Sequence, residues 1–127
     1  MASTTARKFF SRRGSITGGT AISLAALIRS FPAVTGTPAW GSDSSGGISM
    51  DSFHGDGGTV IPLTETLYVG YDSQVADADA AGTYKGVPAA ATVPFGLQDY
   101  CHGVVDLNAV FVYSVGTQDA DIIFQGR

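Results

Sequence analysis

Three residues of this chain are of the types that most often act as nucleophiles or metal ligands: His54, Cys101 and His102. Nucleophilic catalysis and metal binding both require such side chains to converge on one point. Cys101 and His102 are neighbours in sequence, and neighbouring side chains of an extended chain point to opposite faces. The sequence also has no Cys-x-x-Cys or His-x-x-x-His spacing. We therefore expect no catalytic residue, and we interpret these side chains as a buried thiol and surface imidazoles.

Asp72, Asp77 and Asp79 are candidate calcium ligands, because calcium prefers oxygen donors. The segment that begins at Asp77 does not match an EF-hand loop. It lacks the third oxygen ligand, and Pro88 stands where the bidentate glutamate belongs. A solvated acidic turn is the simpler interpretation, and a calcium site formed between loops is the alternative.

Gly-Gly pairs at 18–19, 46–47 and 57–58 raise the question of a phosphate-binding loop. None continues into the Gly-Lys-Ser/Thr ending that cradles phosphates, and the chain has no Gly-x-Ser-x-Gly elbow of a hydrolase. The pairs are interpreted as turns. We expect no cofactor, no metal and no small-molecule substrate, while glycan binding stays an open alternative.

A basic segment with two phenylalanines near the N-terminus is the main candidate for binding a partner. Cations and ring faces of this kind can contact phosphates and bases. Four charges make a weak footprint for nucleic acid, so docking on a partner protein is favoured. A loop or linker at 35–47 adds one aromatic anchor. The predicted partner-binding residues are Arg7, Lys8, Phe9, Phe10, Arg12, Arg13 and Trp40.

Charge is scarce and unevenly distributed along the 127 residues. Charged residues make up 14% of the chain, against about 25% in ordinary globular proteins. The chain carries +5 before its first acid, Asp43, and −9 from there to the end. This division predicts a basic arm and an acidic body. The 17 glycines and the preference for aspartate over glutamate favour turns over helices.

Short runs of β-branched and aromatic residues, bounded by Gly, Asp or Asn, predict strands. The clearest are 66–71, 109–115 and 120–124, and the last two are predicted to form a hairpin across 116–119. Weaker strands are predicted at 48–53, 83–88 and 91–95. Alternation is expected to place three sets of side chains each on a common face: Leu67, Val69 and Tyr71; Phe111, Tyr113 and Val115; Ile122 and Phe124.

Residues 21–29 have the only helical spacing, and Pro32 ends the predicted helix. Two interpretations compete for the region around it. Ser11-Arg12-Arg13 and the weakly apolar run that follows resemble a twin-arginine export signal, cleaved after about residue 39. In the interpretation we favour, these residues stay as a basic arm, a short strand and a helix. The apolar run 16–28 is too short and too polar to span a membrane.

These features predict an all-β chain. We expect residues 41–127 to form a single β-sandwich or jelly-roll-like body. Residues 1–40 would form an extended basic N-terminal arm with a short strand and one short helix, or the export signal. With one cysteine, no internal disulfide can support this fold.

The order of several segments resembles a known class of proteins. The segments are Arg-Arg-Gly-Ser-Ile-Thr-Gly-Gly at 12–19, Leu-Tyr-Val-Gly-Tyr-Asp-Ser-Gln-Val at 67–75, and Val-Asp-Leu-Asn-Ala-Val-Phe-Val-Tyr-Ser-Val at 105–115. Across residues 12–125 the chain resembles small β-sandwich virion structural proteins of tailed bacteriophages, which decorate or cement the capsid. The resemblance carries no catalytic residue.

Several functional expectations follow from this resemblance. It implies a non-enzymatic protein of the virion, a homo-oligomer that binds the major capsid protein or other virion proteins. A tail or fibre-base component is a variant of the same hypothesis. The alternative hypothesis is a secreted β-sandwich binding domain, exported by the twin-arginine route. Contact with nucleic acid or with a membrane is not expected.

Overall fold

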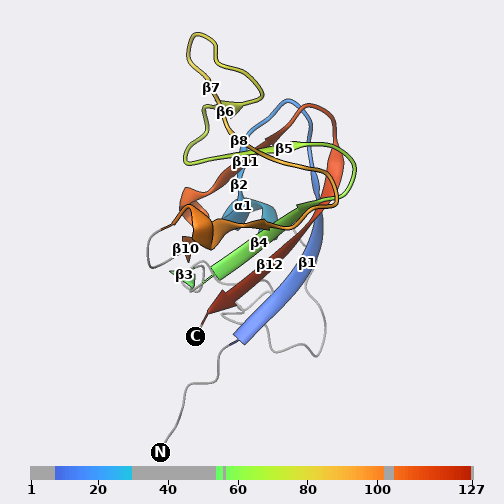
Figure 1. Ribbon diagram of the computed structural model, residues 1–127, viewed down its shortest axis with the longest axis vertical. Helices are drawn as coiled ribbons and strands as arrows, with labels where there is room; N and C mark the ends of the chain where they lie inside the picture. The colour runs from blue at the N-terminus through green and yellow to red at the C-terminus, as the bar shows by residue number, and fades with distance from the viewer. Residues whose placement is uncertain (1–7, 30–53, 56, 102–104, 127) are drawn as a thin grey trace, which may run out of the picture.

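The computed structural model describes residues 8–29, 54, 55, 57–101 and 105–126 (Figure 1). Most of its elements are short strands, and its one α-helix has six residues. In chain order they are β1 (Lys8–Ile16), β2 (Ile22–Ser23), α1 (Leu24–Arg29), β3 (His54–Gly55), β4 (Gly57–Pro62), β5 (Leu67–Gly70), β6 (Val75–Ala76), β7 (Tyr84–Lys85), β8 (Val87–Ala89), β9 (Phe95–Gly96), η2 (Leu97–Asp99), β10 (Val105–Asp106), η3 (Leu107–Ala109), β11 (Phe111–Ser114) and β12 (Gln118–Gly126).

Two four-stranded antiparallel sheets form the body. One has the strand order β1-β12-β4-β9 and the other β2-β11-β5-β8. A short antiparallel pair, β10 with β3, and a short parallel pair, β6 with β7, complete the described strands. The prediction of an all-β, sandwich-like fold with one short helix is therefore confirmed.

The core lies where side chains of both sheets meet the helix and the 3₁₀ turns. Alternation along β5 supplies the core with Leu67 and Val69, and alternation along β12 supplies Ala120 and Ile122, as period-two strands require. Its buried members are Ile16, Leu24, Ala25, Leu27, Val60, Leu67, Val69, Ala89, Leu97, Val105, Leu107, Val110, Val112, Ala120 and Ile122. Packing of this kind, and not a disulfide, holds the described chain together, since its cysteine is free.

Helix α1 begins three residues later than the sequence predicts. Ile22 and Ser23 first pair with β11 as strand β2. The Ser23 hydroxyl then accepts a hydrogen bond from the Ala26 amide at 3.1 Å, which is the usual geometry of an N-cap serine. Leu24 and Leu27 of the helix are fully buried, so this short element belongs to the core.

The predicted hairpin between 109–115 and 120–124 is wrong. Strand β11 pairs with β2 and β5 in one sheet, whereas β12 pairs with β1 and β4 in the other. The turn between them therefore crosses from sheet to sheet. Two consecutive strands joined by a short turn usually pair, but here each finds its partners among strands that are distant in sequence.

The predicted faces are partly corrected by the same arrangement. Val112 and Ser114 are the buried residues of β11, while Phe111 and Tyr113 are half-buried on its other side and Val115 is exposed. Leu67 and Val69 of β5 are buried as predicted, and so is Ile122 of β12. The side chain of Phe124 lies outside the described part of the structure. Large size therefore did not identify the core face of β11.

The described part of the predicted basic N-terminal arm contains a strand that is longer than the short strand expected there. Residues 8–16 form β1, which pairs with β12 along its whole length, from Lys8 opposite Gly126 to Ile16 opposite Gln118. The strand thus belongs to the sandwich. Residues 1–7, the predicted strand at 48–53 and the predicted division at residue 40 lie outside the described residues, so the division stays a prediction.

The acidic segment 72–86 forms an excursion from the body, labelled by β6 and β7 in Figure 1. It is shaped by local hydrogen bonds, including the parallel pairing of Val75 with Tyr84 and a bridge between Ala80 and Thr83. Among the described helices, none has the length and apolar character needed to cross a membrane.

Candidate functional site

The predicted partner-binding residues divide between described and undescribed parts of the chain. Strand β1 contains five of them, Lys8, Phe9, Phe10, Arg12 and Arg13, on the edge of its sheet. Arg7 and Trp40 lie outside the described residues. The structure therefore places the basic residues on one sheet strand, and whether they bind a partner stays a prediction.

Arg13 forms a two-pronged contact with Asp121 of the neighbouring strand. Its Nε and one Nη donate to the two carboxylate oxygens at 2.7 and 3.1 Å. This hydrogen bond and the attraction between the charges lower the pKa of Asp121 and raise that of Arg13. Arg13 is thus paired within its own sheet, and it is not a free cation awaiting a ligand.

Of the three residues with candidate chemistry, Cys101 is the one whose side chain the structure describes. Cys101 is half-buried and free, and His54 pairs in β3 opposite Asp106. His102 lies outside the described residues. Among the residues that the structure describes, no three His, Cys, Asp or Glu side chains are grouped closely enough to hold a metal ion.

Two of the aspartates considered for calcium shape the excursion. Asp72 accepts a hydrogen bond from the Gln74 amide at 2.9 Å, and Asp79 accepts one from the Lys85 amide at 2.8 Å. Such bonds from aspartate to nearby amides are typical of turns. These two carboxylates therefore help to fix the turns of the excursion, and the choice between a solvated acidic turn and a calcium site stays a prediction.

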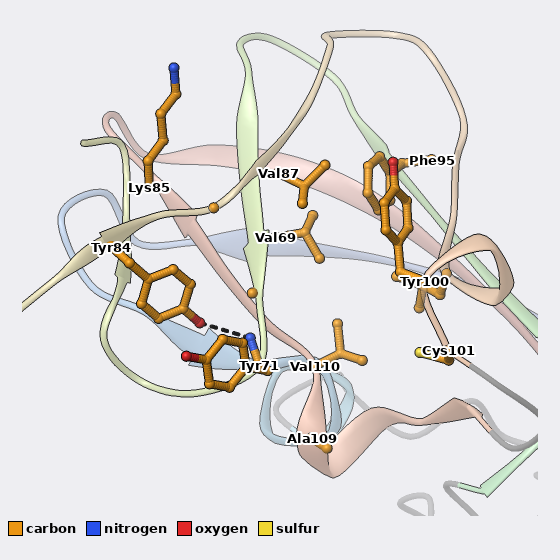
Figure 2. A pocket seen from close by; sticks show the side chains of 13 residues that line it. Val69, Tyr71, Tyr84, Lys85, Val87, Phe95, Tyr100, Cys101, Ala109 and Val110 are labelled. Carbon is orange, nitrogen blue, oxygen red and sulfur yellow. Dashed lines mark hydrogen bonds between the residues drawn. The ribbon is translucent and has the colours of Figure 1, made fainter. Parts of the chain in front are cut away.

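An open apolar cleft of about 390 Å³ lies at one side of the sandwich, between the two sheets (Figure 2). Residues of β5 and β8, together with Ala109 of η3 and Val110 just before β11, contribute from the side of one sheet, and β9 with η2 contributes from the other. Val69, Val87 and Val110 form its floor. Val69 and Val110 also belong to the core, so the cleft is a place where the core reaches the surface.

Two stacked pairs of aromatic rings stand on either side of these valines. Tyr71 and Tyr84 stack with ring centres 4.9 Å apart, and Phe95 and Tyr100 stack at 5.1 Å with nearly parallel planes. Figure 2 shows the pairs flanking Val69, Val87 and Val110. We call this site the aromatic cleft, defined by these two ring pairs and the three valines.

The aromatic cleft is exposed to an unusual degree for such an apolar surface. Tyr71 is 71% exposed, Tyr100 is 60% exposed and Val87 is 39% exposed. Large exposed apolar surfaces on soluble proteins commonly mark binding sites. Its volume also lies in the range of about 300–1,000 Å³ that is typical of ligand sites.

Tyr84 fixes the first ring pair through its hydroxyl. The oxygen accepts hydrogen bonds from the amides of Tyr71, at 2.8 Å, and Asp72, at 3.3 Å. Partial burial raises the pKa of the Tyr84 hydroxyl, and these amide bonds oppose that rise. The Tyr84 hydroxyl therefore fixes the backbone at Tyr71, and the exposed Tyr71 ring is held by this backbone and by stacking on the Tyr84 ring.

Two glycines allow the excursion to pack closely against β5. A Cβ atom on Gly86 would lie 2.6 Å from a methyl of Val75 and 2.9 Å from the Val69 backbone. A Cβ atom on Gly70 would lie 2.7 Å from Val75 and closer still to the Tyr84 hydroxyl. These positions require glycine because the chains approach too closely for a side chain.

Two carboxylates lie close to the ring pairs, that of Asp72 beside the Tyr84 hydroxyl and that of Asp99 beside Gly96. Asp72 follows Tyr71 and Asp99 precedes Tyr100, so each outward ring has a carboxylate beside it in sequence. Asp99 lies over Gly96, where its carboxylate would meet an added Cβ at 3.2 Å. Among the described residues that line the cleft, Lys85 is the cationic one, and Figure 2 shows its side chain pointing away from the valines.

Sequence reasoning did not identify this site. It grouped Tyr71 with Leu67 and Val69 on a common face, whereas Tyr71 follows the end of β5 and is exposed. The available signal was the frequency of aromatic residues between 68 and 100 in a segment interrupted by proline.

Comparison with protein family models, curated proteins and solved structures finds no match for this chain.

Proposed function

We propose that this chain is a non-enzymatic structural protein of a virus particle, which decorates or cements the capsid by binding neighbouring capsid subunits. The resemblance of residues 12–125 to bacteriophage decoration proteins suggests the role. The observation that carries it in the structure is the aromatic cleft. It is an apolar surface on a body of two sheets, exposed at Tyr71, Tyr100 and Val87, and it offers contact area to a partner.

The low charge of the chain supports an assembly role. Protein interfaces are depleted in charged residues at their centres and enriched in tyrosine and phenylalanine. The aromatic cleft has this composition, with four aromatic rings and three valines. Binding by such a surface depends on shape and apolar contact, which is how a decoration protein would hold a shell.

The position of β1 and α1 favours a protein that keeps its N-terminal part. Cleavage after about residue 39, as an export signal requires, would remove the edge strand β1 and the buried side chains of Ile16, Leu24 and Leu27. Loss of three such large core side chains is severe, because each contributes about 1.5–3 kcal/mol when buried. We therefore favour the virion role over the exported binding domain.

The proposed function predicts that the protein is found on particles. Virus particles banded on a density gradient from the organism that encodes the chain should contain it in a fixed ratio to the main shell protein. The intact mass should show that residues 8–29 are retained. A chain found in the soluble or extracellular fraction, absent from particles and shortened by about 39 residues, would contradict the proposal.

A further inference from the structure

Two aromatic side chains of the aromatic cleft, Tyr71 and Tyr100, are held in place and yet exposed to solvent. Tyr84 and the two close-packed glycines fix the first ring pair, as described above. Stacking with Phe95 holds Tyr100 while leaving it 60% exposed. Pre-organised aromatic side chains bind with little loss of conformational entropy. Such rigidity is more useful for recognition than for packing of the domain itself.

The shape of the aromatic cleft fits an extended segment of chain. The two ring pairs stand on opposite sides of the valines, so an occupant that touches both pairs must cross the floor between them (Figure 2). Polyproline II segments are extended, have no internal hydrogen bonds and dock into aromatic-lined grooves. Their proline and aliphatic side chains would pack on the tyrosine rings and the valines.

Addition of a β-strand is disfavoured at this place. Two short strands lie at the sheet edges beside the aromatic cleft, β9 with two residues and β8 with three. Pro88, at the centre of β8, has no amide hydrogen to donate to a neighbouring strand. An occupant would therefore be recognised by its side chains, which again favours a polyproline II segment.

Charge defines the occupant further. Asp72 and Asp99 adjoin the outward rings in sequence, the Asp72 carboxylate lies near the Tyr84 hydroxyl, and the Asp99 carboxylate lies near Gly96. The Lys85 side chain points away from the floor. Exposed tyrosine faces also attract cations, most often arginine. Complementary charge favours a basic residue near each end of the segment.

We propose that the aromatic cleft binds an extended, proline-bearing segment of a partner protein, with arginine or lysine flanking its apolar centre. This inference rests on the proposed function, in which the partner is a neighbouring virion subunit. It names the class of partner segment and the surface that receives it.

The test uses the purified full chain and short fluorescein-labelled peptides, with binding followed by fluorescence anisotropy. The first peptide is Arg-Pro-Leu-Pro-Pro-Leu-Pro-Arg. The second has glutamate in place of both arginines, and the third has a Gly-Ser centre in place of Pro and Leu. We expect the first peptide to bind at least about tenfold more tightly than the others, a difference of about 1.4 kcal/mol.

Matched variants locate the binding. Val87→Thr changes a methyl to a hydroxyl on the floor, and Val115→Thr makes the same change at an exposed valine away from the aromatic cleft. Val87→Thr and Tyr100→Ala should weaken binding of the first peptide by about fivefold or more, while Val115→Thr should leave it unchanged. Asp99→Asn should reduce the preference for arginine over glutamate, whereas Asp119→Asn should not.

Several outcomes would overturn the inference. Equal binding of all three peptides, no binding of the first, or equal effects of Val87→Thr and Val115→Thr would each do so. A dimer in sedimentation velocity that Val87→Thr dissociates would make a second copy the occupant. If the peptide fails to bind while the chain is found on particles, this inference fails and the proposed function stands. If the peptide binds but the chain is absent from particles, the aromatic cleft is a peptide-binding site and the proposed virion function fails.

Discussion

The aromatic cleft and the turn between β11 and β12 differ in which side chains are buried. The turn buries a polar side chain, whereas the aromatic cleft exposes apolar ones. At the turn, the side chain of Gln118 is 4% exposed and every polar atom of it is paired. Its oxygen accepts from the amides of Thr64 and Glu65, and its nitrogen donates to the Glu65 carbonyl and the Ser114 hydroxyl. At the aromatic cleft, large apolar side chains are left in contact with solvent.

Further bonds complete the polar region around Gln118. The Ser114 hydroxyl donates to the Gly116 carbonyl at 2.6 Å, and the Gly116 amide donates to the Glu65 carboxylate at 3.0 Å. We call these four residues, Glu65, Ser114, Gly116 and Gln118, the polar clasp. It lies where the chain crosses between the sheets, and it ties the segment after β4 to the turn before β12.

The comparison teaches which region serves the fold and which is available for function. Buried polar groups destabilise a protein unless they are hydrogen-bonded, and the polar clasp satisfies them internally. Exposed apolar surface gains free energy only when something covers it. Substitutions in the polar clasp should therefore change stability, and substitutions of exposed residues in the aromatic cleft should change binding.

The largest effect is expected from Gln118→Ala. This change leaves two amides, a carbonyl and a hydroxyl without their partner, and it should lower the free energy of unfolding by about 2–4 kcal/mol. Urea unfolding followed by circular dichroism measures the loss. Peptide binding by the fraction that stays folded should be unchanged. A stability within about 0.5 kcal/mol of the parent would show that the polar clasp is an ordinary surface turn.

Gly86→Ala should have the next largest effect, and it should reduce both the stability of the fold and the binding of the peptide. The added methyl meets a Val75 methyl and the Val69 backbone, and such overpacking costs about 1–3 kcal/mol. Because Val69 is part of the floor, peptide binding should weaken as well. Gly82→Ala in the same excursion, where an added Cβ meets no atom within 4 Å although its φ is +82°, should reduce stability without changing binding.

Tyr84→Phe should give a smaller loss. It removes the acceptor of the Tyr71 and Asp72 amides, at a cost of about 1 kcal/mol, and it should weaken peptide binding by loosening Tyr71. A pH titration checks the same hydroxyl. Because the pKa of Tyr84 is raised in the folded state, its contribution is fully present below the ordinary tyrosine pKa. It is lost as the pH rises through the raised value, and ultraviolet absorbance of tyrosinate should show this late ionisation.

The smallest effect is expected at the Arg13–Asp121 pair, which is polar like the polar clasp but exposed. The pKa of Asp121 is lowered in the folded state. The pair therefore stabilises the fold above the ordinary aspartate pKa, near 4, and this contribution is lost as the pH falls through the lowered value. Solvent screening keeps it small. Asp121→Asn should remove that part of the acid dependence of stability, which urea unfolding at several pH values measures. A loss in the free energy of unfolding as large as that of Gln118→Ala would contradict the distinction between exposed and buried polar contacts.

Local pattern was enough to predict the class of the fold. The alternation around Leu67 and Val69 reflects a strand with one buried face, and it holds in the structure. Leu24 and Leu27 likewise report a helix that packs on the core, although its start depends on the pairing of β2. These predictions succeed because burial of one face imposes a period on the sequence.

Such local patterns could not predict which strands, distant in sequence, pair with each other. Nothing local to 109–124 shows that β11 and β12 belong to different sheets, or that Ser114 is buried while Val115 is 56% exposed. In the same way, Tyr71 and Tyr100 reach one site only because β5 and η2 lie at the same side of the sandwich.

The amino-acid sequence by itself determined that the chain forms short strands, many turns and one brief helix, because those features follow from the periodicity and conformational preferences of neighbouring residues. Only the tertiary structure decided that β1 is a sheet strand, that Gln118 is buried and fully hydrogen-bonded, and that two pairs of aromatic rings flank three valines in one cleft. The reason is physical. Each of these features depends on contacts between residues far apart in the chain, and the free energy that selects among such contacts belongs to the packed whole.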